Sequence, residues 1–198
     1  MEASAFSSIL EALVLRVPGA HAAALVDRGG ETVDYAGAVD PFEIKVAAAE
    51  LRLLLDHEGF ALDARPIQVT LRFARRSMII RRLPEGYAVA MVLTRRAGFT
   101  RSTRAFDACA HALSHEAAWT IAPLTWLPVE VECDPAGRPR ALADTPEVRP
   151  VEVIGAVMGL HAGERGYRVR TQAGAEMTLV REPGNWWYAD EPRHAWGH

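Results

Sequence analysis

The sequence predicts an α+β protein in two parts, a five-stranded antiparallel sheet with helices followed by a smaller all-β unit. Three observations support this prediction. Apolar residues recur at helical spacing in three stretches of the first 120 residues. Five short strand-like runs lie between those stretches, and prolines and glycines crowd the chain after residue 122. A chain of 198 residues is long enough for two small domains.

The first segment is expected to form a helix and a hairpin. Ser7 or Ser8 can cap the helix, and Pro18-Gly19 ends it. Residues 22–26 and 32–35 are the expected strands, because both are short apolar runs on either side of a polar turn. The turn, residues 27–30, holds two glycines that can adopt a positive φ.

The second helix is expected to begin at Asp40, which can cap it, with Pro41 at the first helical position. Gly59 is the expected end. The residues assigned to the buried side of this helix are Phe42, Val46, Ala49, Leu51, Leu53 and Leu54.

Three strands and a third helix complete the first part. The strands are expected over 67–73, 78–83 and 87–93, with short connections that favour an antiparallel meander. The helix is expected over 102–119. The order helix, two strands, helix, three strands, helix closes as a five-stranded sheet, and we expect the helices mainly on one face of it. The first domain therefore spans residues 1–122.

The remaining residues are expected to form a linker and a small β domain. The proline-rich stretch 123–150 predicts a linker with one strand at 129–133. Strands are expected over 151–159, 167–171 and 176–180, and an aromatic cluster follows. The simplest closure of residues 151–198 is a small all-β, barrel-like unit.

Composition excludes several classes of protein. No apolar run approaches the length of about 20 residues that spans a bilayer, and the N-terminus lacks the basic start of a signal peptide, so a cytoplasmic location is expected. The two cysteines, Cys109 and Cys133, are too few for a disulfide framework or a four-cysteine zinc site. Residues 65–123 carry ten bases and three acids, although the whole chain is close to neutral.

A local motif gives the first 120 residues a family resemblance. A helix leads into Pro18-Gly19, a small-residue strand, and then Asp27 with Gly30 three positions later. With the strand pair IQVTLRF and SMIIRRL and the helix that begins DPFEIKVAAAELRLLL, this motif resembles the roadblock family (dynein light chain roadblock type) in its bacterial form. The resemblance implies a roadblock-like sheet with profilin-like layering and covers about three fifths of the chain.

The roadblock resemblance also implies a function. Such proteins form dimers and act as non-catalytic scaffolds or regulators of small Ras-like GTPases. We therefore predict a homodimeric adaptor or regulator of a small GTPase or a related signalling complex, without a cofactor. The alternative is a dimerised module that binds a peptide or protein through the C-terminal β unit.

Catalytic motifs give little support to an enzyme. His111 and His115 lie one helical turn apart with Glu116 beside them, a spacing that can hold zinc, but no third ligand is evident. The chain has no phosphate-binding loop and no Gly-x-Ser-x-Gly motif. A metal-dependent enzyme at these histidines is the least favoured alternative.

Arginines dominate the middle of the chain and are the first candidate binding residues. The cluster contains Arg72, Arg75, Arg76, Arg81, Arg82, Arg95, Arg96, Arg101 and Arg104, of which the first five are the candidate partner-binding residues. They can either pair with acids of the same protein or meet an acidic protein partner. Nucleic acid is disfavoured because only Phe73 and Phe99 are available for base stacking.

The aromatic cluster near the C-terminus gives the second set of candidates. Trp186 and Trp187 can form a ligand-binding surface, or they can build the core of a small domain. A strand would direct Trp186 and Tyr188 to one side and Trp187 to the other, which favours mixed use.

Overall fold

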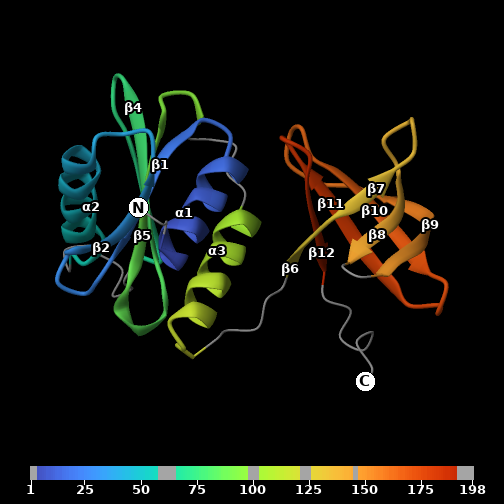
Figure 1. Ribbon diagram of the computed structural model, residues 1–198. Coiled ribbons are helices and arrows are strands. Elements are labelled where there is room, and N and C mark those ends of the chain that lie inside the picture. Colours follow the sequence, from blue (N-terminus) through green and yellow to red (C-terminus); the bar gives the residue numbers. More distant parts are fainter. Residues whose placement is uncertain (1–3, 58–65, 98–102, 121–125, 145–146, 191–198) are drawn as a thin grey trace. The chain divides into compact units, whose positions relative to one another are not determined.

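The chain divides into two compact units, Met1–Ala122 and Pro123–His198. The structure is a computed structural model that describes residues 4–57, 66–97, 103–120, 126–144 and 147–190. Each unit contains its own antiparallel sheet (Figure 1). No helix in these described segments has the length and apolarity needed to cross a membrane.

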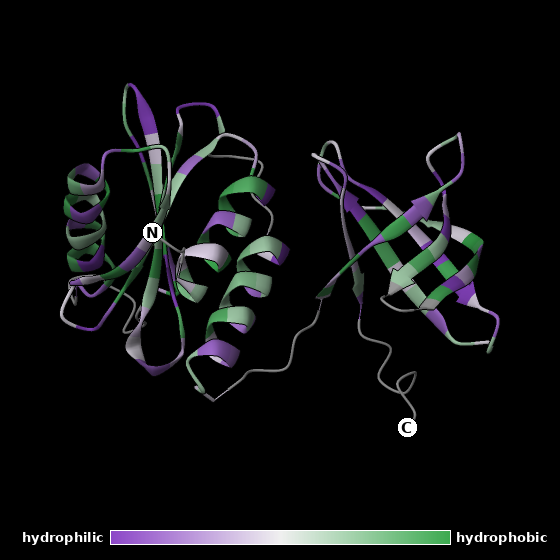
Figure 2. Cartoon of the chain, in the orientation of Figure 1, coloured by the Kyte–Doolittle hydropathy of each residue, from purple (hydrophilic) through white to green (hydrophobic). Residues whose placement is uncertain are grey.

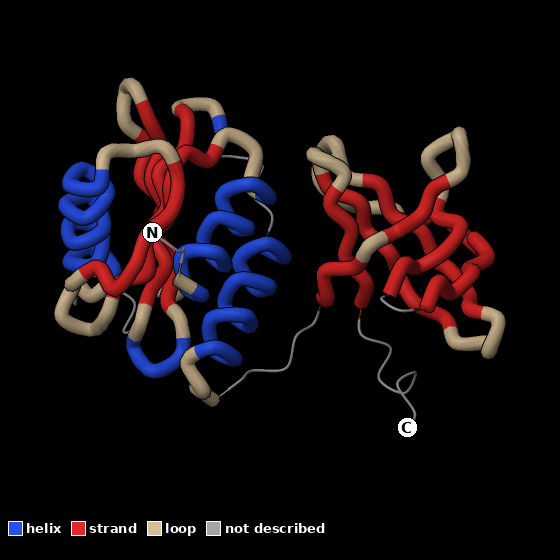
Figure 3. The backbone as a smooth tube through the Cα atoms, viewed as in Figure 1, coloured by secondary structure: helices blue, strands red, loops and turns tan. Residues whose placement is uncertain are grey.

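The first unit contains the predicted order of elements. They are α1 (Ala5–Arg16), β1 (Ala20–Val26), β2 (Thr32–Gly37), α2 (Pro41–Leu55), β3 (Gln68–Arg72), β4 (Arg76–Arg82), a short 3-10 turn (Pro84–Gly86), β5 (Ala88–Thr94) and α3 (Thr103–Glu116). The five strands pair in the order β2-β1-β5-β4-β3, and every pair is antiparallel. The predicted α+β class with a five-stranded sheet is therefore confirmed, and Figure 3 shows its division into helices and strands.

Helix capping differs from the prediction at the first helix and agrees with it at the second. The hydroxyl of Ser4, rather than that of Ser7 or Ser8, accepts a hydrogen bond from the Ser7 amide at 3.0 Å, because the helix begins one turn earlier. Asp40 caps α2 as expected and accepts from the amides of Phe42 and Glu43. Gly59, the expected end of this helix, lies outside the described residues.

Helices cover both faces of the first sheet, which corrects the expectation that they lie mainly on one. In Figure 1, α1 and α3 lie on one side of the sheet and α2 on the other. The α1/α3 face buries Leu10, Leu13, Phe106 and Leu113 against the sheet. On the α2 face, Ile44, Leu51 and Leu55 are buried in the same way. Because both faces are covered, β1 and β5 are apolar along nearly their whole length.

One glycine is required by the pairing of β1 with β2. A Cβ atom on Gly37 would lie 2.3 Å from the carbonyl oxygen of His21, and the φ of Gly37 is 115°. No other residue type fits this position without displacing the backbone. The hairpin that forms one edge of the sheet therefore depends on this residue.

The second unit is a seven-stranded antiparallel sheet. Its strands are β6 (Trp126–Val129), β7 (Val131–Cys133), β8 (Pro139–Asp144), β9 (Glu147–Val157), β10 (Arg165–Thr171), β11 (Glu176–Glu182) and β12 (Trp186–Asp190). They pair in the order β6-β12-β11-β10-β9-β8-β7. The edge strands β6 and β7 are consecutive in the chain, with Glu130 between them, yet no hydrogen-bonded ladder among the described residues joins them. The hydrogen-bonded strand pairs of the second unit therefore form an open sheet, and the expected closed barrel is not confirmed.

The stretch expected to be a linker contains more structure than predicted. Three strands and the start of a fourth lie within residues 126–150 and belong to the second sheet. The sheet tolerates prolines at two positions of this stretch. Pro128 lies in the edge strand β6. Pro150 lies just before Val151, where the pairing of β9 with β10 begins. The sheet buries an apolar core that includes Leu142, Val169, Leu179 and Trp187.

Candidate functional site

Strand alternation divides the predicted arginine cluster between the two faces of the first sheet. Arg76 and Arg82 lie on the α2 side of β4 with Met78 and Ile80, whereas Arg81 lies on the α1/α3 side with Ile79. The five candidate arginines therefore do not form one patch.

Three of these arginines are paired with acids of the same unit. Arg76 forms an ion pair with Glu43. Arg81 lies 2.5 Å from a carboxylate oxygen of Asp107 on α3. Arg82 lies 2.7 Å from a carboxylate oxygen of Asp56, just beyond α2. Their main contacts are internal and join β4 to the helices on both faces.

Four further arginines of the cluster lie at one end of the sheet, here called the basic end: Arg72, Arg75, Arg95 and Arg96. All four are exposed. Arg101 lies outside the described residues. The β3–β4 turn that holds Arg75 lies beside the end of β5, because Arg76 pairs with Thr94. These four side chains present their charge to solvent. Arg72 and Arg75 are candidate partner-binding residues, and Arg95 and Arg96 belong to the wider cluster.

Helix α2 has two apolar sides. Its inner side, Ile44, Ala48, Leu51 and Leu55, is buried against the sheet. A second stripe with the same spacing of four, three and four residues, here called the outer stripe, consists of Phe42, Val46, Ala49 and Leu53. It is offset by two residues, or about 200° around the helix. Phe42 is 75 % exposed and Leu53 is 76 % exposed, and Val46 is also exposed. The prediction that these three residues lie on the buried side of the helix was wrong.

The outer stripe lies in the part of the unit where other apolar side chains are exposed. Leu54 on α2, Ile67 just before β3 and Phe73 just after it belong to the large apolar residues that solvent reaches. Strand β3 is also an edge of the sheet. Figure 2 shows that α2 is hydrophobic along much of its length. A helix that is apolar on opposite sides is typical of a helix covered on both.

The histidines of α3 gain no further metal ligands. Among the residues that the structure describes, no three His, Cys, Asp or Glu side chains lie where they could hold one metal ion. His111 is half-buried, and His115 and Glu116 are exposed. Cys109 lies on the buried side of the same helix, and burial raises the pKa of its thiol to about 12, so it is a core residue.

The aromatic candidates of the second unit are divided between core and surface. Trp187 is 4 % exposed and packs near Tyr167, with ring centroids 6.0 Å apart. It therefore belongs to the core of the sheet, and its role as a partner-binding residue is corrected. Trp186 is half-buried.

The comparisons with known proteins concern the fold of the first unit. No family model and no curated protein matches the chain. The solved structure of Myxococcus xanthus MglB is similar at 12 % identity and a TM-score of 0.50, covering 60 % of this chain and 98 % of that one. A Roadblock/LC7 domain from Streptomyces avermitilis has 17 % identity and a TM-score of 0.48, covering 57 % and 97 %. The similarity to the MglB structure shows that the first unit has the roadblock-like fold that the resemblance implied.

Proposed function

We propose that this protein is a non-catalytic dimeric adaptor that regulates a small Ras-like GTPase in the cytoplasm. The observation that carries the proposal is the outer stripe of α2 beside the edge strand β3. An exposed apolar stripe next to an open edge is a self-complementary surface in a two-fold dimer, where helix meets helix and edge meets edge. The roadblock-like fold supports the regulatory role.

The basic end is the proposed docking surface for the GTPase. Arg75, Arg95 and Arg96 are exposed at one end of the sheet, and Arg72 is exposed beside them. The neighbouring Arg76, Arg81 and Arg82 pair with acids of the same unit. A cluster of exposed guanidinium groups favours an acidic partner surface and accelerates association with it.

The alternative function is a module that binds a peptide or protein through the C-terminal β unit. Of its two candidate residues, Trp186 and Trp187, only Trp186 remains. Trp187 is buried in the core, so changing it to alanine would test the stability of that unit rather than ligand capture. The adaptor proposal thus has the stronger observation behind it.

The test measures binding to the small Ras-like GTPases of the same cell, each loaded with GDP or with a GTP analogue. We expect one of them to bind in one nucleotide state. The double change Arg75→Glu and Arg95→Glu should reduce the association rate at least tenfold, as added salt does. Arg138→Glu with Arg140→Glu, which changes the charge equally in the second unit, is the matched control. Failure of every GTPase to bind in either state would overturn the proposal.

A further inference from the structure

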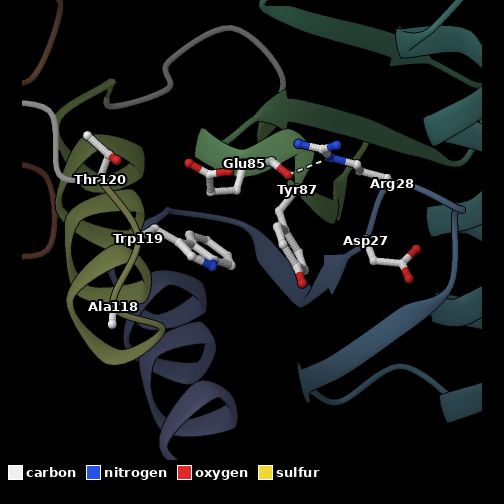
Figure 4. A pocket seen from close by; sticks show the side chains of 7 residues that line it. All are labelled: Asp27, Arg28, Glu85, Tyr87, Ala118, Trp119 and Thr120. Carbon is white, nitrogen blue, oxygen red and sulfur yellow. Dashed lines mark hydrogen bonds between the residues drawn. The ribbon is translucent and has the colours of Figure 1, made fainter.

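A pocket of about 530 Å³ lies at one end of the first unit, and neither the outer stripe of α2 nor the basic end contributes to its lining. Three distant segments meet there: the turn after β1 (Asp27, Arg28), the turn before β5 (Glu85, Tyr87) and the segment after α3 (Ala118, Trp119, Thr120). Figure 4 shows these side chains around a common space. Its volume lies within the range of about 300 to 1,000 Å³ that is typical of ligand sites.

Two stacked rings form one wall of the pocket. The centroids of Tyr87 and Trp119 lie 4.3 Å apart, and the ring planes are inclined by 27°. Both residues also pack against the core on the α1/α3 face, which fixes their positions. Ring faces held in this way attract cations and planar groups.

The backbone around the pocket adopts a costly conformation on two sides. Glu85 has a φ of 55° and Ala118 a φ of 53°, and they are two of the three non-glycine residues with positive φ in the described part of the chain. Such residues concentrate at binding sites, where the surrounding contacts hold them in place.

Arginines supply those contacts on the Glu85 side. Arg28 Nε donates to the carbonyl oxygen of Glu85 at 2.8 Å. Arg52 is buried, pairs with Asp56 at 2.6 Å, and donates to the carbonyl oxygen of Gly86 at 2.8 Å. The turn that carries Glu85 and Tyr87 is therefore fixed before any ligand arrives.

The charge of the pocket selects a cationic ligand. The carboxylates of Asp27 and Glu85 outnumber the single guanidinium of Arg28, so the lining carries a formal charge of −1. One Asp27 oxygen accepts from the Glu31 amide at 2.9 Å, and the hydrogen bond of Arg28 goes to a backbone carbonyl. The Glu85 carboxylate lines the pocket and can accept from a cationic ligand, and the net negative charge of the lining disfavours a phosphate group.

We propose that this pocket binds an arginine side chain from a peptide segment of a protein partner. A guanidinium group is planar and delocalised, so it can stack on Tyr87 or Trp119 while it donates to the carboxylate of Glu85. A lysine ammonium has the same charge but lacks the planar face and should bind more weakly. The inference does not depend on the proposed GTPase partner.

The experiment titrates the full chain with the blocked tripeptide Gly-Arg-Gly and follows the indole N–H signals by NMR. The Trp119 signal is assigned with the variant Trp119→Phe. We expect a saturable shift of this signal, a weaker effect of the lysine tripeptide, and none from the citrulline tripeptide, which keeps the shape and loses the charge. Glu85→Gln should weaken binding about tenfold, because it removes a charged hydrogen-bond partner.

A control variant, Glu31→Gln, and a second ligand, GTP, complete the experiment. Glu31→Gln removes an exposed carboxylate from the same hairpin without altering the pocket lining, and it should bind the arginine tripeptide as the unchanged protein does. Three results would overturn the inference: equal binding of the citrulline tripeptide, unchanged binding by Glu85→Gln, or a Trp119 shift with GTP rather than with arginine.

Discussion

The two faces of the five-stranded sheet are covered in different ways. On the α1/α3 face two helices cover the strands, and the far end of α3 is polar where it meets solvent, at His115 and Glu116. On the opposite face α2 is the one helix of the described residues that covers the sheet, and its own outer stripe is apolar. On the α1/α3 side the exposed large apolar residue of the described helices is Leu15, whereas the α2 side presents a whole stripe of apolar side chains.

This difference is the reason why we place the proposed dimer surface on α2. Apolar surface removed from water contributes about 25 cal/mol per Å², and the outer stripe together with Ile67 and Phe73 still exposes such surface. The inner side of the helix stabilises the unit, and its outer side is the surface that the proposed dimer would bury.

The largest effect that we predict concerns the α1/α3 face. Cys109 is buried there and the pKa of its thiol is raised to about 12, whereas Cys133 is exposed in the second unit. At pH 8, N-ethylmaleimide should modify Cys109 about a thousandfold more slowly than Cys133, because reaction requires opening of the fold. Mass spectrometry of the intact protein should show one adduct before denaturation and two after it. Equal rates would show that this face opens readily.

A pair of leucines on α2 sharpens the comparison within one helix. Leu51 is 1 % exposed on the inner side, and Leu53 is 76 % exposed on the outer stripe. Leu51→Ala should lower the free energy of unfolding by about 3 kcal/mol, since it leaves a cavity. Leu53→Ala should change the stability of a single chain by less than about 0.5 kcal/mol.

Urea unfolding at several protein concentrations distinguishes the two variants. Leu51→Ala should lower the transition midpoint at every concentration. Leu53→Ala should lower the transition midpoint only at the higher protein concentrations. At these concentrations association stabilises the folded chain by mass action. Similar losses for both variants at low concentration would contradict the assignment of the two sides.

The smallest predicted effect is a gain in stability at the end of α3. Ala118 adopts a positive φ there, and the amide of Trp119 donates to the carbonyl oxygen of Ser114 at 2.9 Å, as in a helix end that favours glycine. Ala118→Gly should stabilise the protein by about 0.5 to 1 kcal/mol in thermal unfolding. Asn185→Gly is the control with a smaller expected gain, because asparagine tolerates this conformation. A loss of stability with Ala118→Gly would contradict the account.

The order of elements in the first unit could be predicted because it depends on local signals. Asp40 and Pro41 begin α2 in the structure as they do in the sequence. The turn between Asp27 and Gly30 likewise follows from residues that favour it, and Gly30 has a φ of 87°. Capping residues and glycines act within a few positions, so one sequence is enough to identify them.

The side of α2 that faces the sheet could not be predicted. The spacing of apolar residues identifies a stripe on the helix but not which element covers that stripe. Ile44 and Leu51 share the same spacing as Val46 and Leu53, and only the sheet determines which set is buried. The ion-pair partners of the candidate arginines could not be predicted for a similar reason. The partners of Arg81 and Arg82, Asp107 and Asp56, are each about 26 positions away in the chain, a separation that local patterns do not resolve.

The prolines of the second unit were misleading for a related reason. Proline interrupts a central strand but is compatible with an edge strand or the end of a ladder. Pro128 and Pro150 occupy such positions, which can be recognised only when the pairing of the strands is known.

The most direct test of the central claim is the mass of the protein in solution. Light scattering at about 20 μM should give twice the chain mass for the unchanged protein, because such a concentration is ample for a specific dimer of micromolar or tighter affinity. Leu53→Glu should give the mass of a single folded chain, with an unchanged circular dichroism spectrum. Leu15→Glu, which alters an exposed leucine on α1, should remain a dimer. A single-chain mass for the unchanged protein, or equal behaviour of the two glutamate variants, would contradict the claim that the outer stripe of α2 is the dimer surface.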